Sequence, residues 1–267
     1  MCRLLGIVAS EPTDFRIVLS HAPRSMAALS VEHRDGWGIA VFDAAGEHDW
    51  RVDRGIDPAS EDVRFHERAL GSRGELLVAH IRQKTVGPTS LENTHPFRRG
   101  HWIFAHNGTI HELAWLAARV SPARRAELAG QTDSELFFAY LLTRLDEAGL
   151  SDGPIVVATD AVIRRAAAEA RAVPNVGAFN FVLSDGDALY AHRFGRTLCL
   201  LERGPDDEVR SSRKSMDGVV VQTPWSQRRR ALFVASEAMT DEPWQTIDNG
   251  VLLRLDRTPQ PRWRLIA

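Results

Sequence analysis

The second residue of the chain, Cys2, combines two groups that acyl-transfer chemistry needs. Its side chain is small enough to permit removal of Met1, which would make Cys2 the N-terminal residue. That residue then has a thiol and a free α-amine, with reference pKa values of about 8.5 and about 7.7–8.0. The thiol would be the nucleophile and the amine its base. The alternative is that Cys2 is a small buried residue at the start of a strand.

Other residues along the chain are suited to hold and activate an amide substrate. Asn107 and Gly108 offer an amide side chain and a backbone N–H as oxyanion donors, although Asn-Gly is also a favoured tight-turn pair. Arg82 suits bidentate binding of a carboxylate. Asp133 suits an ammonium group, although acidic residues favour helix N-termini in any case. A substrate with both an α-carboxylate and an α-amine, such as glutamine or another γ-glutamyl compound, would use both charges.

The elements that must position these residues follow from the hydrophobic pattern. A strand over residues 3–9 leads away from Cys2, a strand over 76–81 ends at Arg82, and a strand over 101–105 leads to the Asn-Gly pair. Thr132 and Glu135 form a capping box that predicts the start of the helix bearing Asp133. The other predicted helices cover residues 12–30 (broken at Pro23), 57–70, 110–119, 122–129 and 160–172, and the other predicted strands cover 38–42, 179–183, 188–191, 198–202, 218–222, 231–235, 251–255 and 262–266.

The order of these elements is strands, then helices, then more strands. This order predicts an α+β fold in which two sheets have helices packed outside them, within a single domain over residues 1–267. A polar segment over residues 202–216 is predicted to be a mobile loop. The glycines on either side of Trp37 fit neither the P-loop nor the dinucleotide-binding spacing, so a nucleotide-binding loop is not predicted there.

Composition and charge exclude several classes of protein. The net charge of −2 argues against a nucleic-acid scaffold. Two cysteines do not form a disulfide framework, and the apolar run around Cys199 predicts a buried thiol. The sequence has no secretory signal pattern and no apolar run of membrane-spanning length, so we expect a soluble cytoplasmic protein.

The histidines and tryptophans are expected to be structural. A zinc site is not favoured, because the histidines match no known zinc spacing and buried or hydrogen-bonded histidine is the commoner state. Large aromatic residues usually belong to the core and not to a pocket. The residues considered are His95, His101, His106, His111, Trp37, Trp102, Trp115, Trp225 and Trp244.

Six short motifs occur in the order found in class II glutamine amidotransferase domains, and the chain resembles that family over roughly residues 2–140. Six ordered motifs are far more specific than any one of them. They are Cys2 with Gly6, Asp35-Gly36-Trp37-Gly38, His80-Ile81-Arg82 with Thr85, Asn93-Thr94-His95-Pro96-Phe97, Ala105-His106-Asn107-Gly108 and Thr132-Asp133-Ser134-Glu135. The second half resembles the standalone, YafJ-like branch through Asn180-Phe181-Val182-Leu183-Ser184-Asp185-Gly186, Ala235-Ser236-Glu237 and Asp241-Glu242-Pro243-Trp244.

The resemblance implies a four-layer αββα sandwich of two antiparallel sheets, as in N-terminal-nucleophile hydrolases. It implies that Cys2 is the nucleophile and that Asn107 and Gly108 form the oxyanion hole. Arg82 and Asp133 would bind the α-carboxylate and α-amine of the glutamyl group. Thr85 and His106, in the same motifs, would be further substrate-binding residues. No cofactor or metal is implied, and any ammonia-accepting synthase would be a separate chain.

Three functions agree with these residues. The first is a glutamine amidohydrolase or amidotransferase subunit that hydrolyses the amide through a Cys2 thioester after removal of Met1. The second is a γ-glutamyl hydrolase acting on a modified γ-glutamyl amide, similar to the ergothioneine-pathway enzyme. The third is a non-catalytic γ-glutamyl-binding or regulatory subunit. Gln83 and Lys84 stand where many relatives have an aromatic or small residue, so this resemblance does not define the details of the loop after Arg82.

Overall fold

The computed structural model describes residues 2–44, 46–204, 213–214, 220–221 and 229–267. The described helices are the π-helical turn η1 (Ile17–His21), α1 (Met26–Leu29), α2 (Val63–Leu70), α3 (Leu113–Ala117), α4 (Pro122–Ala126), α5 (Asp133–Glu147) and α6 (Val157–Arg171). The described strands are β1 (Arg3–Asp14), β2 (Trp37–Asp43), β3 (Asp49–Gly55), β4 (Arg73–Ile81), β5 (Phe97–Arg99), β6 (Trp102–Ile110), β7 (Gly177–Ser184), β8 (Ala188–His192), β9 (Cys199–Arg203), β10 (Arg213–Lys214), β11 (Val220–Val221), β12 (Ala231–Ala235), β13 (Gln245–Thr246), β14 (Leu252–Asp256) and β15 (Arg262–Leu265).

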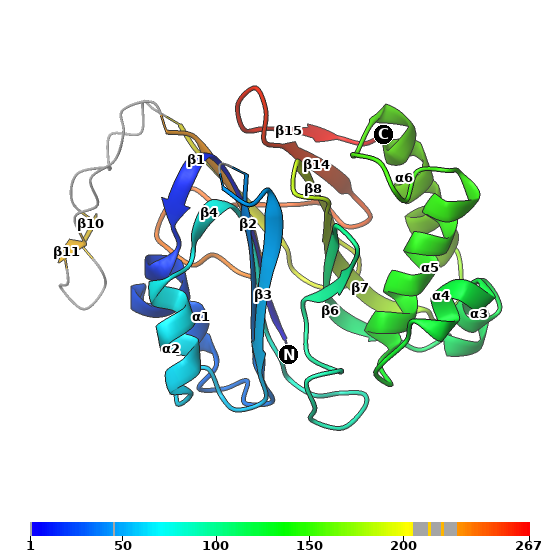
Figure 1. Cartoon of the computed structure of the whole chain (residues 1–267), viewed down its shortest axis with the longest axis horizontal. Helices are drawn as coiled ribbons and strands as arrows, with labels where there is room; N and C mark the ends of the chain where they lie inside the picture. Colours follow the sequence, from blue (N-terminus) through cyan, green and yellow to red (C-terminus); the bar gives the residue numbers. More distant parts are fainter. Residues whose placement is uncertain (1, 45, 205–212, 215–219, 222–228) are drawn as a thin grey trace.

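Two antiparallel sheets lie face to face, with helices on the outer face of each (Figure 1). The first sheet has the strand order β13-β9-β12-β1-β4-β2-β3, and the second has the order β15-β14-β8-β7-β6-β5. Helices α1 and α2 cover the first sheet, and α5 and α6 cover the second (Figure 1). The predicted four-layer αββα sandwich is therefore confirmed.

Three apolar clusters fill the three spaces between the four layers. Strand β1 shows how the sequence produces this arrangement, because its side chains alternate between the two faces of the sheet. Leu5 and Ile7 pack under the helices, whereas Leu4 and Val8 pack against the second sheet. Burial of each such side chain stabilises the fold by about 1.5–3 kcal/mol. Since β1 also pairs with β12 on one edge and β4 on the other, the strand that follows Cys2 is fixed on all sides.

The helix predicted over residues 12–30 is wrong in its first part. Strand β1 continues to Asp14, where its last residues pair with the start of β4. Only the single turn η1 and the short helix α1 follow, and the Ser25 side chain caps α1 by accepting from Ala28 N at 3.3 Å. Tertiary strand pairing thus overrides the local helical spacing. The helix predicted over residues 57–70 is also shorter, because Asp62 caps it and α2 begins at Val63.

The Asn107-Gly108 pair is not a tight turn. Strand β6 runs straight through it, and Asn107 and Gly108 pair with Asn180 and Phe179 of β7. Long-range pairing again determines the backbone conformation, because strand β7 supplies hydrogen-bond partners for the main chain of this pair. The strand β3 and the short strands β5, β10 and β13 were not predicted.

Three predictions fall on residues that the structure does not fully describe. The predicted mobile loop over residues 202–216 lies largely outside the described residues, and so does Trp225. Of the strand predicted over residues 218–222, the pair Val220–Val221 is described, and it forms β11. In the described part of the chain, every helix is too short or too polar to cross a bilayer.

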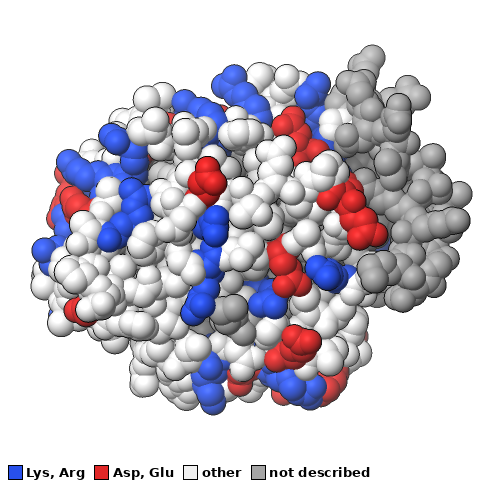
Figure 2. All heavy atoms as spheres, turned by 180° about the vertical axis from the view of Figure 1, so that it is seen from behind, with Lys and Arg blue, Asp and Glu red and all other residues white. Residues whose placement is uncertain are grey.

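The surface seen in Figure 2 mixes the two signs of charge. Basic and acidic side chains are interspersed over this face of the described residues, without an extended field of one sign. This distribution differs from the basic stripe expected of a nucleic-acid-binding surface.

Candidate active site

The pairing of β1 with β4 places Cys2 beside the residues that follow β4. Arg3 pairs with Ile81, so the chain preceding Arg3 lies next to the chain following Ile81. Gln83 N–H donates to Cys2 Sγ at 3.2 Å, and the thiol donates to the Gln83 carbonyl oxygen at 3.3 Å. Burial raises the pKa of the Cys2 thiol, and the hydrogen bond from the Gln83 backbone partly opposes this shift. The thiol is therefore protonated at neutral pH and needs a base to become a nucleophile.

A narrow cavity lies at Cys2, with walls from both sheets; its empty space of about 300 Å³ includes space that is open to solvent. Its walls come from four segments: the start of β1, the loop after β4, the middle of β6 and the start of α5. Six of the seven predicted site residues line it together, and the seventh, Asn107, lies next to it on β6. The lining residues are Cys2, Arg82, Gln83, Thr85, Val86, Asn93, His95, His106, Gly108, Thr132, Asp133 and Ser134.

Two opposite charges are buried in the walls of this cavity. Arg82 is 3% exposed and Asp133 is 4% exposed. Arg82 Nη2 donates to the carbonyl oxygens of Val86 and Pro88, both at 3.1 Å, whereas Nη1 is buried without a hydrogen-bond partner among the described residues. Burial lowers the pKa of Arg82, but an arginine remains charged in proteins.

The Asp133 carboxylate lies in the first turn of α5. Its Oδ2 accepts from Ile110 N at 2.7 Å, whereas its Oδ1 lies 3.4 Å from Ser134 Oγ, whose single proton is donated to His106 Nδ1. Within the described part of the chain, neither Asp133 nor Arg82 forms an ion pair. Buried charges in proteins are normally paired, since an unpaired buried charge is costly. The cavity therefore has one cationic and one anionic wall group without a protein counter-ion.

His106, on β6, lines the cavity and contacts the start of α5 through Ser134. Burial lowers the pKa of His106, so the ring is neutral. Nε2 donates to the Ala178 carbonyl oxygen at 3.3 Å, which leaves Nδ1 to accept from Ser134 Oγ at 2.8 Å. Both ring nitrogens of His106 are thus engaged by the protein.

His80 and His95 lie behind His106. Burial lowers the pKa of His80 to about 3, and its Nε2 donates across the gap between the sheets to the His106 carbonyl oxygen at 3.1 Å. The His95 ring packs against His80 with 4.3 Å between ring centroids, and burial lowers its pKa as well. Among the described residues, no group of three histidine, cysteine or acidic side chains is placed to bind a metal ion.

The two predicted oxyanion donors lie side by side on β6. Asn107 is buried, and its Nδ2 donates to Ser236 Oγ at 3.1 Å. At Gly108, a Cβ would lie 2.0 Å from the Ala178 carbonyl oxygen of the neighbouring strand, so no larger residue fits without displacing β7. Thr85, on the loop after β4, accepts from Thr109 Oγ1 at 3.3 Å across the cavity mouth.

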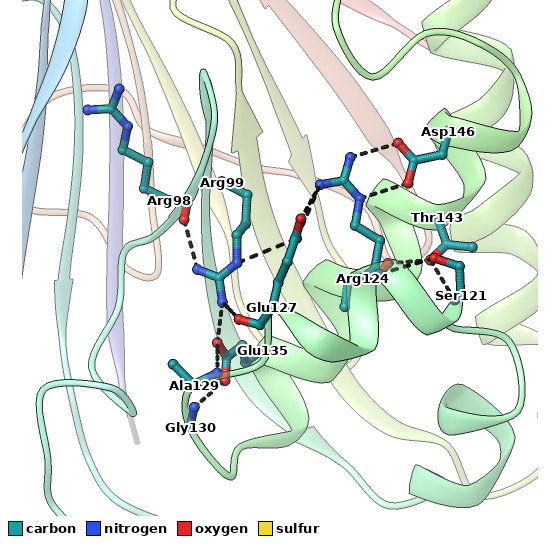
Figure 3. A network of polar contacts seen from close by, with 11 residues as sticks. Arg98, Arg99, Ser121, Arg124, Glu127, Ala129, Gly130, Glu135, Thr143 and Asp146 are labelled. Carbon is teal, nitrogen blue, oxygen red and sulfur yellow. Dashed lines mark hydrogen bonds and ion pairs between the residues drawn. The ribbon is translucent and has the colours of Figure 1, made fainter.

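The loop before α5 is held by charged side chains (Figure 3). Glu135 accepts from Ala129 N at 3.0 Å and Gly130 N at 2.7 Å, and it pairs with Arg99 at 2.5 Å. The predicted capping box is therefore half correct. Thr132 accepts from Glu135 N at 3.2 Å, but the Glu135 carboxylate binds the preceding loop and not the backbone of Thr132.

A second charged pair anchors the start of that loop. Arg124 on α4 binds Asp146 on α5 through two bonds of 2.7 Å, and it also contacts Glu127 at 3.2 Å (Figure 3). From the other side, Asn93 Oδ1 accepts from Gln131 N at 2.8 Å. Together these contacts fix the backbone that leads into Asp133.

Sequence reasoning assigned no role to several residues of the site. Asn93, His95, Ser134 and Ser236 belong to the motifs quoted above, but the sequence predicted no catalytic or binding role for any of them individually; Thr132 was predicted only as the cap of the helix. No sequence signal marked Gln83, because it contacts Cys2 Sγ through main-chain atoms that any residue other than proline provides.

Comparison with known proteins agrees with this geometry. The family model for class II glutamine amidotransferases matches residues 1–261. The chain is 29% identical over 267 residues to the putative glutamine amidotransferase YafJ of Escherichia coli, covering 94% of this chain and 95% of that protein. It is 31% identical over 213 residues to the γ-glutamyl-hercynylcysteine sulfoxide hydrolase of Mycobacterium tuberculosis, covering 76% and 81%.

A solved structure gives the same result for the fold. The crystal structure of a predicted glutamine amidotransferase from Pseudomonas aeruginosa is similar with a TM-score of 0.66 and 27% identity, covering 99% of both chains. The family match includes every residue of the cavity and every strand of both sheets except the edge strand β15. This chain therefore belongs to the class II glutamine amidotransferases and is an amide-hydrolysing enzyme with the N-terminal-nucleophile fold.

Proposed function

We propose that the protein hydrolyses the side-chain amide of glutamine, after removal of Met1, through a thioester on Cys2. The observation that supports this most directly is a pair of buried charges, Arg82 and Asp133, that have no counter-ion among the described residues and lie in the cavity that Cys2 lines. An α-amino acid with a free carboxylate and a free amine would pair with both. The unpartnered Arg82 Nη1 provides the donor for the carboxylate, and Asp133 provides the acceptor for the amine.

The proposed reaction begins with the α-amine of Cys2, which takes the thiol proton. The thiolate attacks the γ-carbonyl carbon, and the oxyanion is stabilised by the Asn107 side chain and the Gly108 N–H. The carbon–nitrogen bond then breaks, the proton passes from the amine to the leaving nitrogen, and ammonia departs. Water hydrolyses the γ-glutamyl thioester and releases glutamate. In this scheme Thr85 and His106 line the glutamyl site, with His106 holding Ser134 beside Asp133.

A second candidate substrate is a γ-glutamyl amide with a larger leaving group. The 31% identity to a γ-glutamyl-hercynylcysteine sulfoxide hydrolase favours it. The glutamyl part of such a substrate would use the same two charges, so the two candidates differ only in the group attached to the amide nitrogen.

A release assay with two substrates separates these candidates. Protein whose N-terminal residue is verified as Cys2 is given glutamine or an N-substituted γ-glutamyl amide, and ammonia, amine and glutamate are measured. We expect ammonia from glutamine, and a Cys2→Ala variant should lose at least about 10⁴-fold in kcat. Release of the larger amine with no ammonia from glutamine would favour the second candidate. Full activity with Met1 retained would contradict the mechanism, because the α-amine would then be acylated.

A further inference from the structure

A polar side chain from the C-terminal half of the chain, Ser236, contacts a proposed oxyanion donor. Ser236 follows directly after β12, and β12 pairs with β1 in the first sheet. Its backbone N–H donates to the Leu4 carbonyl oxygen at 2.9 Å, and its Oγ accepts from Leu4 N at 3.0 Å. Ser236 is thus fixed by two bonds to the residue that lies two positions after Cys2.

The same oxygen also reaches the second sheet. Ser236 Oγ accepts from Asn107 Nδ2 at 3.1 Å, and both residues are buried. One hydroxyl oxygen therefore connects the strand of the nucleophile to the side chain proposed to stabilise the oxyanion. It makes this connection across the space between the sheets, at the end of the cavity where bond breaking would occur.

This contact determines the direction of the Asn107 amide. The terminal torsion of an asparagine side chain is broad, so an unpartnered amide samples many orientations. A bond from one Nδ2 hydrogen to Ser236 leaves the second hydrogen pointing in a fixed direction. Oxyanion stabilisation depends on donors that are already oriented before charge develops. A fixed amide would therefore act on the transition state and leave binding of the substrate's charged ends unchanged.

We propose that Ser236 is a positioning residue for amide hydrolysis, which orients the Asn107 side chain as an oxyanion donor relative to the Cys2 strand. This inference rests on the proposed function. Loss of the hydroxyl in a Ser236→Ala variant should lower kcat about tenfold, less than the 10²–10³-fold expected for removal of a donor itself. KM for glutamine should stay within about twofold, because Arg82 and Asp133 are untouched.

The decisive measurement is a double-mutant cycle with Asn107→Ala. If Ser236 acts through Asn107, adding Ser236→Ala to Asn107→Ala should cause no further loss of kcat. Ser184→Ala is the matched control, since Ser184 is a buried serine whose hydroxyl donates to Ala188 O at 2.6 Å in the β7–β8 hairpin. It removes a buried hydroxyl elsewhere and should leave kcat and KM unchanged. If Ser236→Ala does not fold, Ser236→Cys replaces the oxygen with a weak acceptor and serves in the same cycle.

Three results would overturn the inference. They are an unchanged kcat in Ser236→Ala, an equal loss of kcat in the wild-type and Asn107→Ala backgrounds, or a loss that appears only in KM. These outcomes differ from failure of the proposed function, in which the wild-type protein would release neither ammonia nor amine from any γ-glutamyl amide.

Discussion

The two ends of the cavity are held in place by different kinds of contact. At the Cys2 end, strand pairing, the Gln83 backbone and the Ser236 hydroxyl fix the proposed nucleophile and oxyanion donor through neutral hydrogen bonds. At the Asp133 end, the loop before α5 is held by the ion pairs of Arg99 with Glu135 and Arg124 with Asp146. Paired strands can shift only by whole residues, so small displacements at the Cys2 end are resisted. A loop held by side chains can move by a fraction of an ångström without losing all its contacts. Changes at the first end should therefore reduce kcat, and changes at the second should raise KM.

The largest effect is expected at the neutral end. Asn107→Ala removes a proposed oxyanion donor and should lower kcat by about 10²–10³-fold with little change in KM. Steady-state kinetics of ammonia release from glutamine measure both values. A variant that loses activity mainly through KM would contradict the assignment of this end to the transition state.

The next effect is expected at the charged end. Asp133→Asn keeps an oxygen that can accept from Ile110 N but removes the charge proposed to bind the α-amine. KM for glutamine should rise about 10–100-fold, in line with the loss of a buried charge-assisted hydrogen bond. Glutaramate, which lacks the α-amine, is the control substrate, and its KM should be the same in both proteins. An equal rise for both substrates would show that Asp133 has only a structural role.

A smaller effect is expected from the contacts behind Asp133. Glu135→Gln breaks the buried pair with Arg99 and weakens the loop, so KM should rise about threefold and stability should fall by up to about 3 kcal/mol. Glu127→Gln is the matched control, because its carboxylate is 41% exposed and exposed pairs contribute about 0–1 kcal/mol. Denaturant unfolding and glutamine kinetics check both variants. A loss of kcat in Glu135→Gln without a change in KM would contradict the proposal that the Asp133 end acts on substrate binding.

A further difference is a pH dependence of stability at the neutral end, which is expected to leave kcat and KM for glutamine largely unchanged near neutral pH. Burial lowers the pKa of His80 to about 3, so the unfolded chain takes up a proton near pH 6.5 before the folded one does. The stabilisation is complete above pH 6.5 and is lost as the pH falls toward 3, by about 1.4 kcal/mol per pH unit. His80→Asn retains a donor for the His106 carbonyl oxygen and should reduce the slope of stability against pH between pH 6.5 and 5, while the other buried histidines keep their contributions. Equal slopes for the two proteins in denaturant unfolding would contradict the prediction.

The sequence predicts the layers and the cavity better than it predicts the contacts within them. Short, largely continuous apolar runs predict β1, β4 and β6, and the six ordered motifs include Cys2, Arg82 and Asp133. The helix predicted over residues 12–30 fails because pairing of β1 with β4 is a long-range event that no local spacing encodes. The same limit applies to the Asn107-Gly108 pair, where local propensity favours a turn and the neighbouring strand produces an extended chain.

Side-chain partners are harder still to predict, because they depend on distances that the fold creates. Glu135 has the correct spacing for a capping box, yet Arg99 lies close enough to draw its carboxylate to the preceding loop. Ser236 lies 129 residues from Asn107 in the chain, so no periodic pattern relates them. The proposed roles of the site residues stay predictions until the variants above are measured.

The contacts between Cys2 Sγ and Gln83 have a consequence for substitution at position 83. Both use main-chain atoms of residue 83, so the side chain at this position is released from the requirement to hold the thiol. In this protein that side chain instead contacts His33, with 3.3 Å between Gln83 Oε1 and His33 Nδ1. Any residue other than proline at position 83 can therefore hold the sulfur through the same two main-chain contacts.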